Sequence, residues 1–418
     1  MKKIIKVHGR QVFDSRGNPT VEAEIYLSDK TKASAIVPSG ASTGAYEAYE
    51  LRDENKNYFF GKSVLKAVKN INTVINKSLK NINIHDQKKI DKILLNLDGT
   101  ENKKRLGANA LLAVSLAASK VAASSKKKEL YQNLGKKFLL PKPLMNIING
   151  GAHADNNLRI QEFMIRPDSA KNFMDAMEKC FLVIQNLKII LKSKNLLTNV
   201  GDEGGFAPSI NSNEEALKMV VDSIEKSKLK PGKDISICLD VAANELINHD
   251  GQYSLNSSKF ISVDESIKYY KKLISKYPIK SIEDPFAEND WNAWSRLTKE
   301  IGKKVQIVGD DLFVTNVARL KRGIKEKSAN SILIKVNQIG TLTETLNVIE
   351  LAKKNNFSTV ISHRSGDTED TFIADLAVAT QSTQIKTGSL ARSERVAKYN
   401  RLLRIEEQLG KSVKIARI

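Results

Sequence analysis

Short apolar runs, each ending in a polar side chain, recur along the second half of the chain. Six such runs follow one another between residues 237 and 389, and their polar ends lie 23 to 43 residues apart. One strand, one helix and two short loops fill such an interval, which is the repeating unit of a (β/α) barrel. The runs ICLDVA, SIEDPF, QIVGDD, SILIKV, TVISHR and QIKTGS carry Asp240, Glu283, Asp310, Lys335, His363 and Lys386. Barrel enzymes place their active sites where strands end, so the pattern predicts an active site at one mouth.

The barrel is predicted to begin with a hairpin. The runs LMNIIN and EFMI precede the repeats, and the segment between them is too short for a crossover helix. Pro141 and Pro143 prevent a helix from continuing through residues 135–143, which we therefore interpret as a linker. The sequence thus predicts an α/β barrel domain at residues 140–418.

The first part of the chain, residues 1–135, follows a different pattern. VHGRQVFDS, TVEAEIYLS and KASAIVPS alternate between apolar and polar positions, which predicts three antiparallel strands. Helical periodicity follows from about Gly61, so a small α+β domain is expected. Its small-residue loop 38–46 is either an active-site lid or a domain connection. The apolar stretch 108–123 contains Asn109, Ser115 and Lys120 and is predicted to be a buried helix rather than a membrane span.

Composition favours a folded protein of a reducing compartment. Hydrophobic residues make up 41% of the chain, enough for a packed core. The apolar run at the N-terminus is too short for a signal peptide. The two cysteines, Cys180 and Cys238, form no CxxC pair. We therefore expect a cytoplasmic protein.

The net charge of +20 raises the question of an anionic partner. The lysines are scattered through the chain, and the Lys126–Lys128 cluster has no interleaved aromatic residues. No recognisable nucleic-acid-binding motif is present. A solvated basic surface is therefore favoured over dedicated nucleic-acid binding, while a nucleic acid or surface ligand stays open as an alternative. The positive field would help to attract an anionic substrate.

Three of the strand-end residues are carboxylates from successive repeats. Asp240, Glu283 and Asp310 offer hard oxygen ligands without a cysteine or histidine set, which favours Mg²⁺. The alternative is ordinary surface acids in loops. Asp284 and Asp311 are adjacent acids, and because neighbours on a strand point to opposite faces, we expect only one member of each pair to face the barrel axis.

Lys335 lies in an apolar run, where a solvated lysine is unexpected. Burial and a nearby divalent cation would both lower its pKa and let it accept a proton, whereas a structural ion pair is the alternative. Lys386 would lower that pKa further or bind an anion. His363, Arg364 and Ser365 offer a guanidinium fork and a hydroxyl, which suits a phosphate.

Two further motifs are ambiguous on local grounds. Glu203 lies in the glycine-rich GDEGGFAP, where local sequence alone favours a plain acidic turn over a functional role. His153 in NGGAH favours a structural role when it is considered alone.

Together these segments resemble the enolase family of bacterial type, the 2-phosphoglycerate dehydratases, from about residue 5 to 410. The enolase superfamily uses a lysine or histidine base with one or two Mg²⁺ ions. The resemblance implies Mg²⁺-dependent, reversible conversion of 2-phosphoglycerate to phosphoenolpyruvate on a barrel whose units begin ββαα. The motifs that carry it are DSRGNPTVE, SGASTG, NGGAH, QEFMI, VGDEGGFAP, SIEDPFAE, GDDLFVTN, LIKVNQIGTLTET, SHRSGDTEDTFIADLAV and IKTGSLARSERVAKYNRLLRIEEQLG.

The resemblance also implies a role for each matching residue. Lys335 would remove the C2 proton, and Glu203 would be the acid for the C3 hydroxide. A carboxylate-rich surround is expected to raise the pKa of Glu203 so that it carries a proton. The first Mg²⁺ would be held by Asp240, Glu283 and Asp310, and the second would arrive with substrate and be reached by Ser42 of the lid. The substrate-binding residues would be His153, Gln161, Glu162, Lys335, His363, Arg364, Ser365 and Lys386.

Within that set the expected contacts differ. Gln161 and Glu162 would lie near the leaving hydroxide, and His153 would close over the substrate. Arg364 and Ser365 would take the phosphate, and Lys386 the carboxylate. The family implies a homodimer or a larger ring of dimers such as an octamer.

Two other interpretations compete with this one. A racemase or cycloisomerase of the same superfamily would carry a Lys-x-Lys pair on the strand before the metal ligands, and this chain has none. An additional binding role, at a cell surface or in an RNA-processing complex, is compatible with the basic charge and with a secondary surface or secreted pool. The chain departs from the family in its basic composition and at Tyr46, a position that varies among members.

Overall fold

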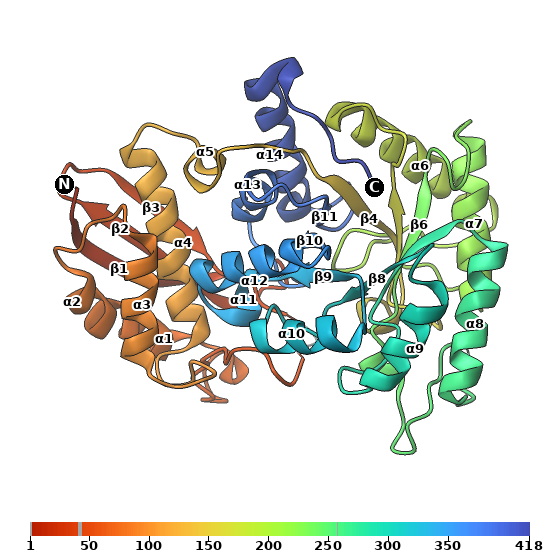
Figure 1. The fold of residues 1–418 in the computed structure, drawn as a ribbon, viewed down its shortest axis with the longest axis horizontal. Coiled ribbons are helices and arrows are strands. Elements are labelled where there is room, and N and C mark those ends of the chain that lie inside the picture. The colour runs from red at the N-terminus through yellow and green to blue at the C-terminus, as the bar shows by residue number, and fades with distance from the viewer. Residues whose placement is uncertain (1, 41–43, 257) are drawn as a thin grey trace.

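The computed structural model describes residues 2–40, 44–256 and 258–418. A three-stranded sheet with helices comes first along the chain, and a closed eight-stranded barrel follows (Figure 1). The predicted fold class, a barrel with a smaller N-terminal α+β part, is confirmed.

The three predicted N-terminal strands are present as one antiparallel sheet in the order β1 (Ile4–Phe13), β2 (Pro19–Leu27) and β3 (Lys32–Ile36). The turn between β1 and β2 is built on Asp14, whose Oδ1 accepts from the backbone N–H groups of Arg16 and Asn18 at 2.8 and 2.9 Å. Gly17 has φ +73°, a left-handed conformation that glycine adopts without strain.

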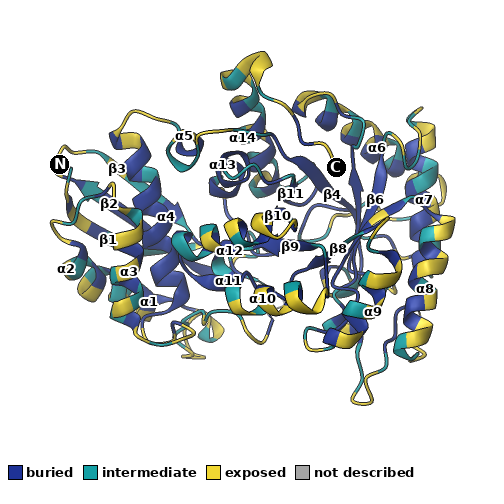
Figure 2. Ribbon diagram, viewed as in Figure 1, coloured by how far each residue is buried: buried dark blue, intermediate teal, exposed yellow. Residues whose placement is uncertain are grey.

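Helices cover one face of this sheet. They are α1 (Leu65–Asn70), α2 (Asn76–Leu79), α3 (Gln87–Asp98), α4 (Ala108–Ser125) and α5 (Leu130–Leu134). Helix α4 packs on β2 and β3 and is dark blue over nearly its whole length in Figure 2. By length and composition α4 could cross a membrane, but 89% of it is buried inside the structure, as predicted for a core helix.

The barrel strands follow the predicted order. They are β4 (Lys142–Asn149), β5 (Glu162–Arg166), β6 (Ser236–Asp240), β7 (Ile279–Glu283), β8 (Gln306–Gly309), β9 (Ser331–Ile334), β10 (Ser358–Ser362) and β11 (Gln384–Lys386). Strand β5 is antiparallel to both β4 and β6, and the remaining neighbours are parallel. The predicted hairpin is confirmed. Strand β4 begins at Lys142, so the last residues of the expected linker belong to the barrel.

The barrel helices are α6 (Phe173–Ser193), α7 (Asn213–Lys226), α8 (Val263–Lys276), α9 (Trp291–Ile301), α10 (Val317–Glu326), α11 (Val336–Ile339), α12 (Leu342–Lys354), α13 (Phe372–Ala379) and α14 (Ser393–Leu409). Two of them, α6 and α7, lie between β5 and β6, which gives the expected ββαα start.

A small separate core fills the barrel interior with one side chain from each of six strands: Leu144, Met164, Cys238, Val308, Leu333 and Val360. Because side chains alternate along a strand, the residue two positions beyond an interior residue shares its face. Asp240, Asp310 and Lys335 stand two positions beyond Cys238, Val308 and Leu333. The core therefore aims these three groups at the mouth of the barrel.

Buried polar contacts hold the N-terminal part against the barrel. Lys103 forms an ion pair with Glu344 at 2.8 Å, and Asp370 pairs with Lys120 at 2.6 Å. The backbone of Ser39 exchanges hydrogen bonds of 2.7 and 2.9 Å with Gly366. This last pair fixes the start of loop 38–46 beside the ends of the barrel strands.

Candidate active site

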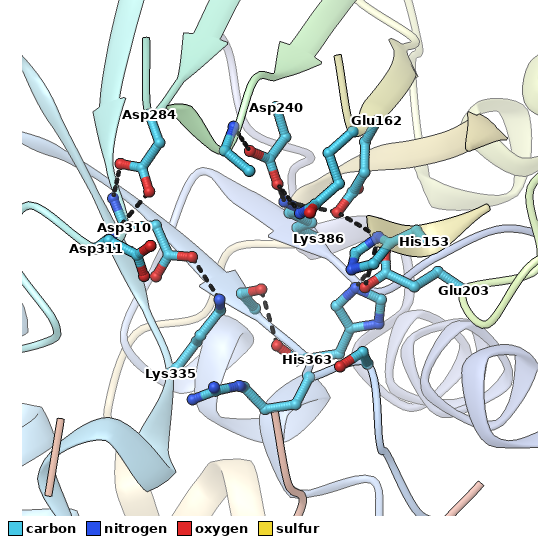
Figure 3. Close-up of a pocket in the computed structure, with 15 residues that line it drawn as sticks. His153, Glu162, Glu203, Asp240, Asp284, Asp310, Asp311, Lys335, His363 and Lys386 are labelled. Atoms are coloured by element: carbon cyan, nitrogen blue, oxygen red, sulfur yellow. Dashed lines mark hydrogen bonds and ion pairs between the residues drawn. The ribbon is translucent and has the colours of Figure 1, made fainter. Parts of the chain in front are cut away.

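A single cavity at the mouth of the barrel collects almost all of the predicted site residues (Figure 3). Eleven predicted residues line it: His153, Gln161, Glu162, Glu203, Asp240, Asp310, Lys335, His363, Arg364, Ser365 and Lys386. Glu283 reaches the same place through its contact with Lys386. Ser42, the predicted ligand of a second metal ion, lies outside the described residues.

Lys386 is the centre of an acidic cluster. Its Nζ lies 2.9 Å from Asp240 Oδ2, 2.8 Å from Glu283 Oε1 and 3.1 Å from Glu162 Oε1. All four side chains are buried. Burial lowers the pKa of Lys386, but the three carboxylates outweigh burial and raise it well above its usual value.

The same cluster contains more carboxyl groups than its one lysine can balance, and some of their oxygens are available as ligand atoms. Burial, together with the neighbouring carboxylates, raises the pKa values of Glu162 and Glu283 well above their usual range. The second carboxylate oxygens of these two residues, both Oε2, are buried and have no hydrogen-bond partner among the described residues. Buried carboxylate oxygens without a hydrogen-bond partner are suitable ligand atoms for a hard divalent cation, so these residues fit such an ion.

Both members of each adjacent acid pair reach the site, so the expectation that only one would do so is wrong. Asp284 and Asp311 line the cavity. Strand β7 ends at Glu283 and Asp284 has φ +42°, so the alternation of a strand stops there. The Asp284 carboxylate accepts the backbone N–H groups of Asp310 and Asp311, both at 2.9 Å.

The second acidic cluster is therefore Asp284, Asp310 and Asp311, whose carboxylate oxygens lie within 4.8 Å of one another. Burial and the charge of Asp310 raise the pKa of Asp311 to about 7. Sequence analysis assigned no role to Asp284 or Asp311. Their adjacency to Glu283 and Asp310 in the sequence could have indicated a role in the site. The alternation of side chains along a strand argued against such a role.

Lys335 lies beside an acid, and this contact acts on its pKa in the direction opposite to burial. Burial lowers its pKa, but the adjacent Asp310 raises it, and the balance is upward. The Nζ group forms an ion pair with Asp310 Oδ2. Gln338 Nε2 donates to the other oxygen, Oδ1, at 2.8 Å. The low pKa expected from the sequence assumes a divalent cation beside Lys335, so it stays a prediction for the metal-bound enzyme.

The surroundings of Glu203 differ from those expected, because its nearest neighbours are nitrogen-bearing groups rather than carboxylates. The direction of its pKa shift is therefore also the reverse of the expected one. Its carboxylate lies 3.4 Å from His363 Nε2 and 3.8 Å from His153 Nδ1, and it accepts from Asn146 Nδ2 at 3.3 Å. Burial raises the pKa of Glu203, but His363, His153 and Lys386 outweigh burial and hold it well below its usual range.

Arg364 meets an acid from the N-terminal part of the chain. Its Nη1 lies 2.8 Å from Glu47 Oε2 and donates to Asn337 Oδ1 at 3.1 Å. Glu47 lies just past the end of the predicted loop 38–46, at whose end the Tyr46 ring stacks 4.0 Å from the guanidinium of Arg319. Sequence analysis missed Glu47 because nothing local distinguishes it from other surface acids.

Fold and site define a barrel enzyme with a smaller α+β part, whose mouth joins acidic clusters to buried lysines and an arginine. Residues 4–134 match the family model described as enolase, N-terminal domain, and residues 137–417 match enolase, C-terminal TIM barrel domain. A curated enolase of Pelagibacter ubique (strain HTCC1062) is 65% identical over 420 residues, which cover 100% of both chains. The chain therefore belongs to the enolase family, an assignment that makes it an enzyme of the lyase class and confirms the resemblance.

Proposed function

We propose that this enzyme catalyses the reversible, Mg²⁺-dependent dehydration of 2-phospho-D-glycerate to phosphoenolpyruvate in glycolysis and gluconeogenesis. The observation that carries the proposal is the convergence of Lys335 and Glu203 on one cavity (Figure 3), which Lys386, its neighbours Asp240 and Glu162, and Arg364 also line. The cavity thereby offers one small substrate a base, an acid, carboxylates that could hold a cation, and an anion-binding group.

Lys335 is the proposed base for the C2 proton. A proton beside an ionised carboxylate is weakly acidic because its removal adds negative charge to that group. Mg²⁺ held by Asp240, Glu283 and Asp310, with a second ion reached from Ser42, would supply the positive charge that stabilises the developing enolate. Lys335 must first lose its own proton, and the contact with Asp310 opposes this loss.

Glu203 is the proposed acid for the C3 hydroxide. For this role it needs a proton, whereas His363 and His153 favour its carboxylate form in the substrate-free enzyme. The proposal therefore requires that substrate binding alter these contacts before the hydroxide leaves. Gln161 and Glu162, buried beside Asp240, are proposed to face the leaving group.

The remaining groups are proposed to bind the two anionic ends of the substrate. Arg364, Ser365 and His363 follow one strand end and suit the phosphate, because a guanidinium offers two parallel donors. Lys386 suits the carboxylate, and His153 is proposed to close over the substrate from the β4–β5 segment.

We also propose that the chain has two domains, at residues 1–135 and 140–418, and acts as a cytoplasmic homodimer or as an octamer built from dimers. Helix α5 ends at Leu134 and β4 begins at Lys142, which supports the domain bounds. The two free, buried cysteines suit a reducing compartment. Light scattering of the purified chain tests the oligomeric state.

The experiment that tests the proposed function is conversion of 2-phosphoglycerate to phosphoenolpyruvate by the purified chain. Turnover should occur with Mg²⁺, vanish with excess EDTA and return when Mg²⁺ is restored. A folded chain without turnover in Mg²⁺ would overturn the proposed reaction. Turnover that persists in EDTA would overturn the metal requirement alone.

A further inference from the structure

Arg395 lies in α14, outside the cavity, yet its guanidinium contacts the residues that line it. The side chain is fully buried, and its Nη1 lies 2.6 Å from Nδ1 of His363. A guanidinium carries only N–H donors and stays protonated in proteins. The contact is therefore a hydrogen bond only if Nδ1 of His363 is an acceptor without a proton.

The same guanidinium joins two loops of the active site. Its Nη1 also donates to the carbonyl oxygen of Arg364 at 2.5 Å. Its Nη2 donates to the carbonyl oxygens of Ser365 at 2.5 Å and Asp202 at 3.1 Å. Arg395 thus holds the His363–Ser365 segment against the residue that precedes Glu203.

We propose that Arg395 is a positioning residue that fixes the neutral Nε2–H tautomer of His363 and directs that N–H group to Glu203. With Nδ1 occupied by the guanidinium, the single ring proton must sit on Nε2. This atom is buried, has no hydrogen-bond partner among the described residues, and lies 3.4 Å from Glu203 Oε2. The consequence for catalysis rests on the proposed role of Glu203, whereas the tautomer itself does not. His363 then acts as an N–H donor to the acid and does not supply it with a proton from an imidazolium.

The charges around His363 agree with a neutral ring. Burial lowers its pKa to about 4, and Arg395 lowers it too, while Glu203 and Asp367 act in the opposite direction. Beyond Glu203 the facing charged groups are Lys386 and Glu162, and His153 is the other titratable neighbour. Protonation of Nδ1 would set two N–H donors against each other, an arrangement that a fixed guanidinium opposes at any pH near neutrality.

The tautomer can be observed in the unmodified enzyme. The chain has five histidines, so ¹⁵N labelling of histidine alone gives a spectrum in which the His363→Asn variant assigns His363 by the loss of its signals. We expect an unprotonated Nδ1 and a protonated Nε2 for His363 in the substrate-free enzyme. A protonated Nδ1 would overturn the proposal. This result does not depend on turnover, so it separates failure of the inference from failure of the proposed function.

A second experiment tests the consequence for catalysis with Arg395→Met, Arg395→Lys and a matched control. Arg401 lies on the same helix and forms partly buried ion pairs with Asp375 and Glu129 away from the cavity, so Arg401→Met removes a guanidinium from the same helix without touching the site. For Arg395→Met we expect kcat to fall about 10²-fold, with a smaller change in KM and a displaced acidic limb of the pH profile. Arg395→Lys should recover part of kcat, because an ammonium can still donate to Nδ1.

The control decides whether this loss is specific. Arg401→Met should lower thermal stability but leave kcat per folded enzyme near the wild-type value. If Arg395→Met resembles Arg401→Met in kcat and in pH profile, the positioning role is overturned. If Arg395→Met does not fold, the ¹⁵N spectrum of the wild-type enzyme decides the inference.

Discussion

Glu47 Oε2 and Arg364 Nη1 form a buried ion pair of 2.8 Å that joins the N-terminal part of the chain to the barrel mouth. The guanidinium proposed to bind the substrate phosphate is thus already paired with a carboxylate of this chain. Under the proposed function, the Glu47 carboxylate contacts the same guanidinium as the substrate phosphate. We therefore predict that substrate binding exchanges one anion for another at Arg364.

Replacement of Glu47 should reveal this exchange. Glu47→Gln leaves the buried Arg364 charge without its carboxylate, which should destabilise the ligand-free enzyme by about 3 kcal/mol. Inorganic phosphate should then raise the melting temperature of Glu47→Gln by more than it raises that of the wild type, because the anion refills the position. Differential scanning calorimetry with and without phosphate measures both effects. Equal phosphate-induced shifts in the two proteins would show that Glu47 does not occupy the phosphate position.

The proposed base and acid predict a separation of two half-reactions. Lys335→Ala should lose both C2 proton exchange and dehydration, by at least about 10³-fold, because no base remains. Glu203→Gln should lose dehydration to a similar degree but retain part of the exchange, since Lys335 is intact. Exchange is followed by deuterium incorporation at C2 in heavy water. Wild-type exchange in Lys335→Ala would assign the base elsewhere.

Lys386 balances buried carboxylates, so its removal should make stability depend on a cation. In EDTA, Lys386→Met should lose about 3–5 kcal/mol of stability because Asp240, Glu283 and Glu162 are left without a counter-charge. Mg²⁺ should restore more of the melting temperature of this variant than it adds to the wild type. Lys398→Met, which removes a buried partner of Asp367 outside the cluster, is the control. A Mg²⁺ response no larger in Lys386→Met than in Lys398→Met would contradict a cation site among these carboxylates.

The depressed pKa of His363 predicts loss of stability in mild acid. Its folded-state pKa is about 4 against an ordinary 6.5, so between these values the unfolded chain binds a proton that the folded chain does not. The contribution of neutral His363 to the free energy of unfolding is therefore fully present above about pH 6.5. It is lost as the pH falls towards 4, and the total loss is about 3 kcal/mol. Urea unfolding at pH 7 and pH 4.5 measures the difference. His363→Asn should reduce the difference, and an unchanged difference would refute the assignment.

The architecture was predictable because it rests on periodic signals. The spacing of the strand ends predicts that Asp240, Asp310, Lys335 and Lys386 lie at one mouth, and the short segment before EFMI predicts the hairpin. Both depend on backbone geometry that every repeat shares. The role of α4 was clear from its interrupted apolar run.

The electrostatic state of the site was not predictable in the same way. The pKa of Lys335 depends on which group lies within a few ångströms of Nζ, and that group, Asp310, lies 25 residues away in the sequence. Glu203 meets His363 and His153 from two other segments. Contacts of this kind arise from tertiary packing, and no local pattern encodes them. The contacts of Arg395 could not be predicted from the sequence for the same reason.

The reversed direction of β5 has a consequence for loop exchange. Strand β4 ends at Asn149 and β5 begins at Glu162, so the segment between them lies at the barrel mouth. This segment contains His153 and Gln161. Both ends of this segment are anchored in adjacent hydrogen-bonded strands.

Asn156 Nδ2 and the Ile160 N–H group in this segment donate to the Pro208 carbonyl oxygen and to Asn213 Oδ1. We therefore expect an exchange of this segment between family members to require matching residues at positions 208 and 213, while Lys335 and Asp310 keep their own surroundings.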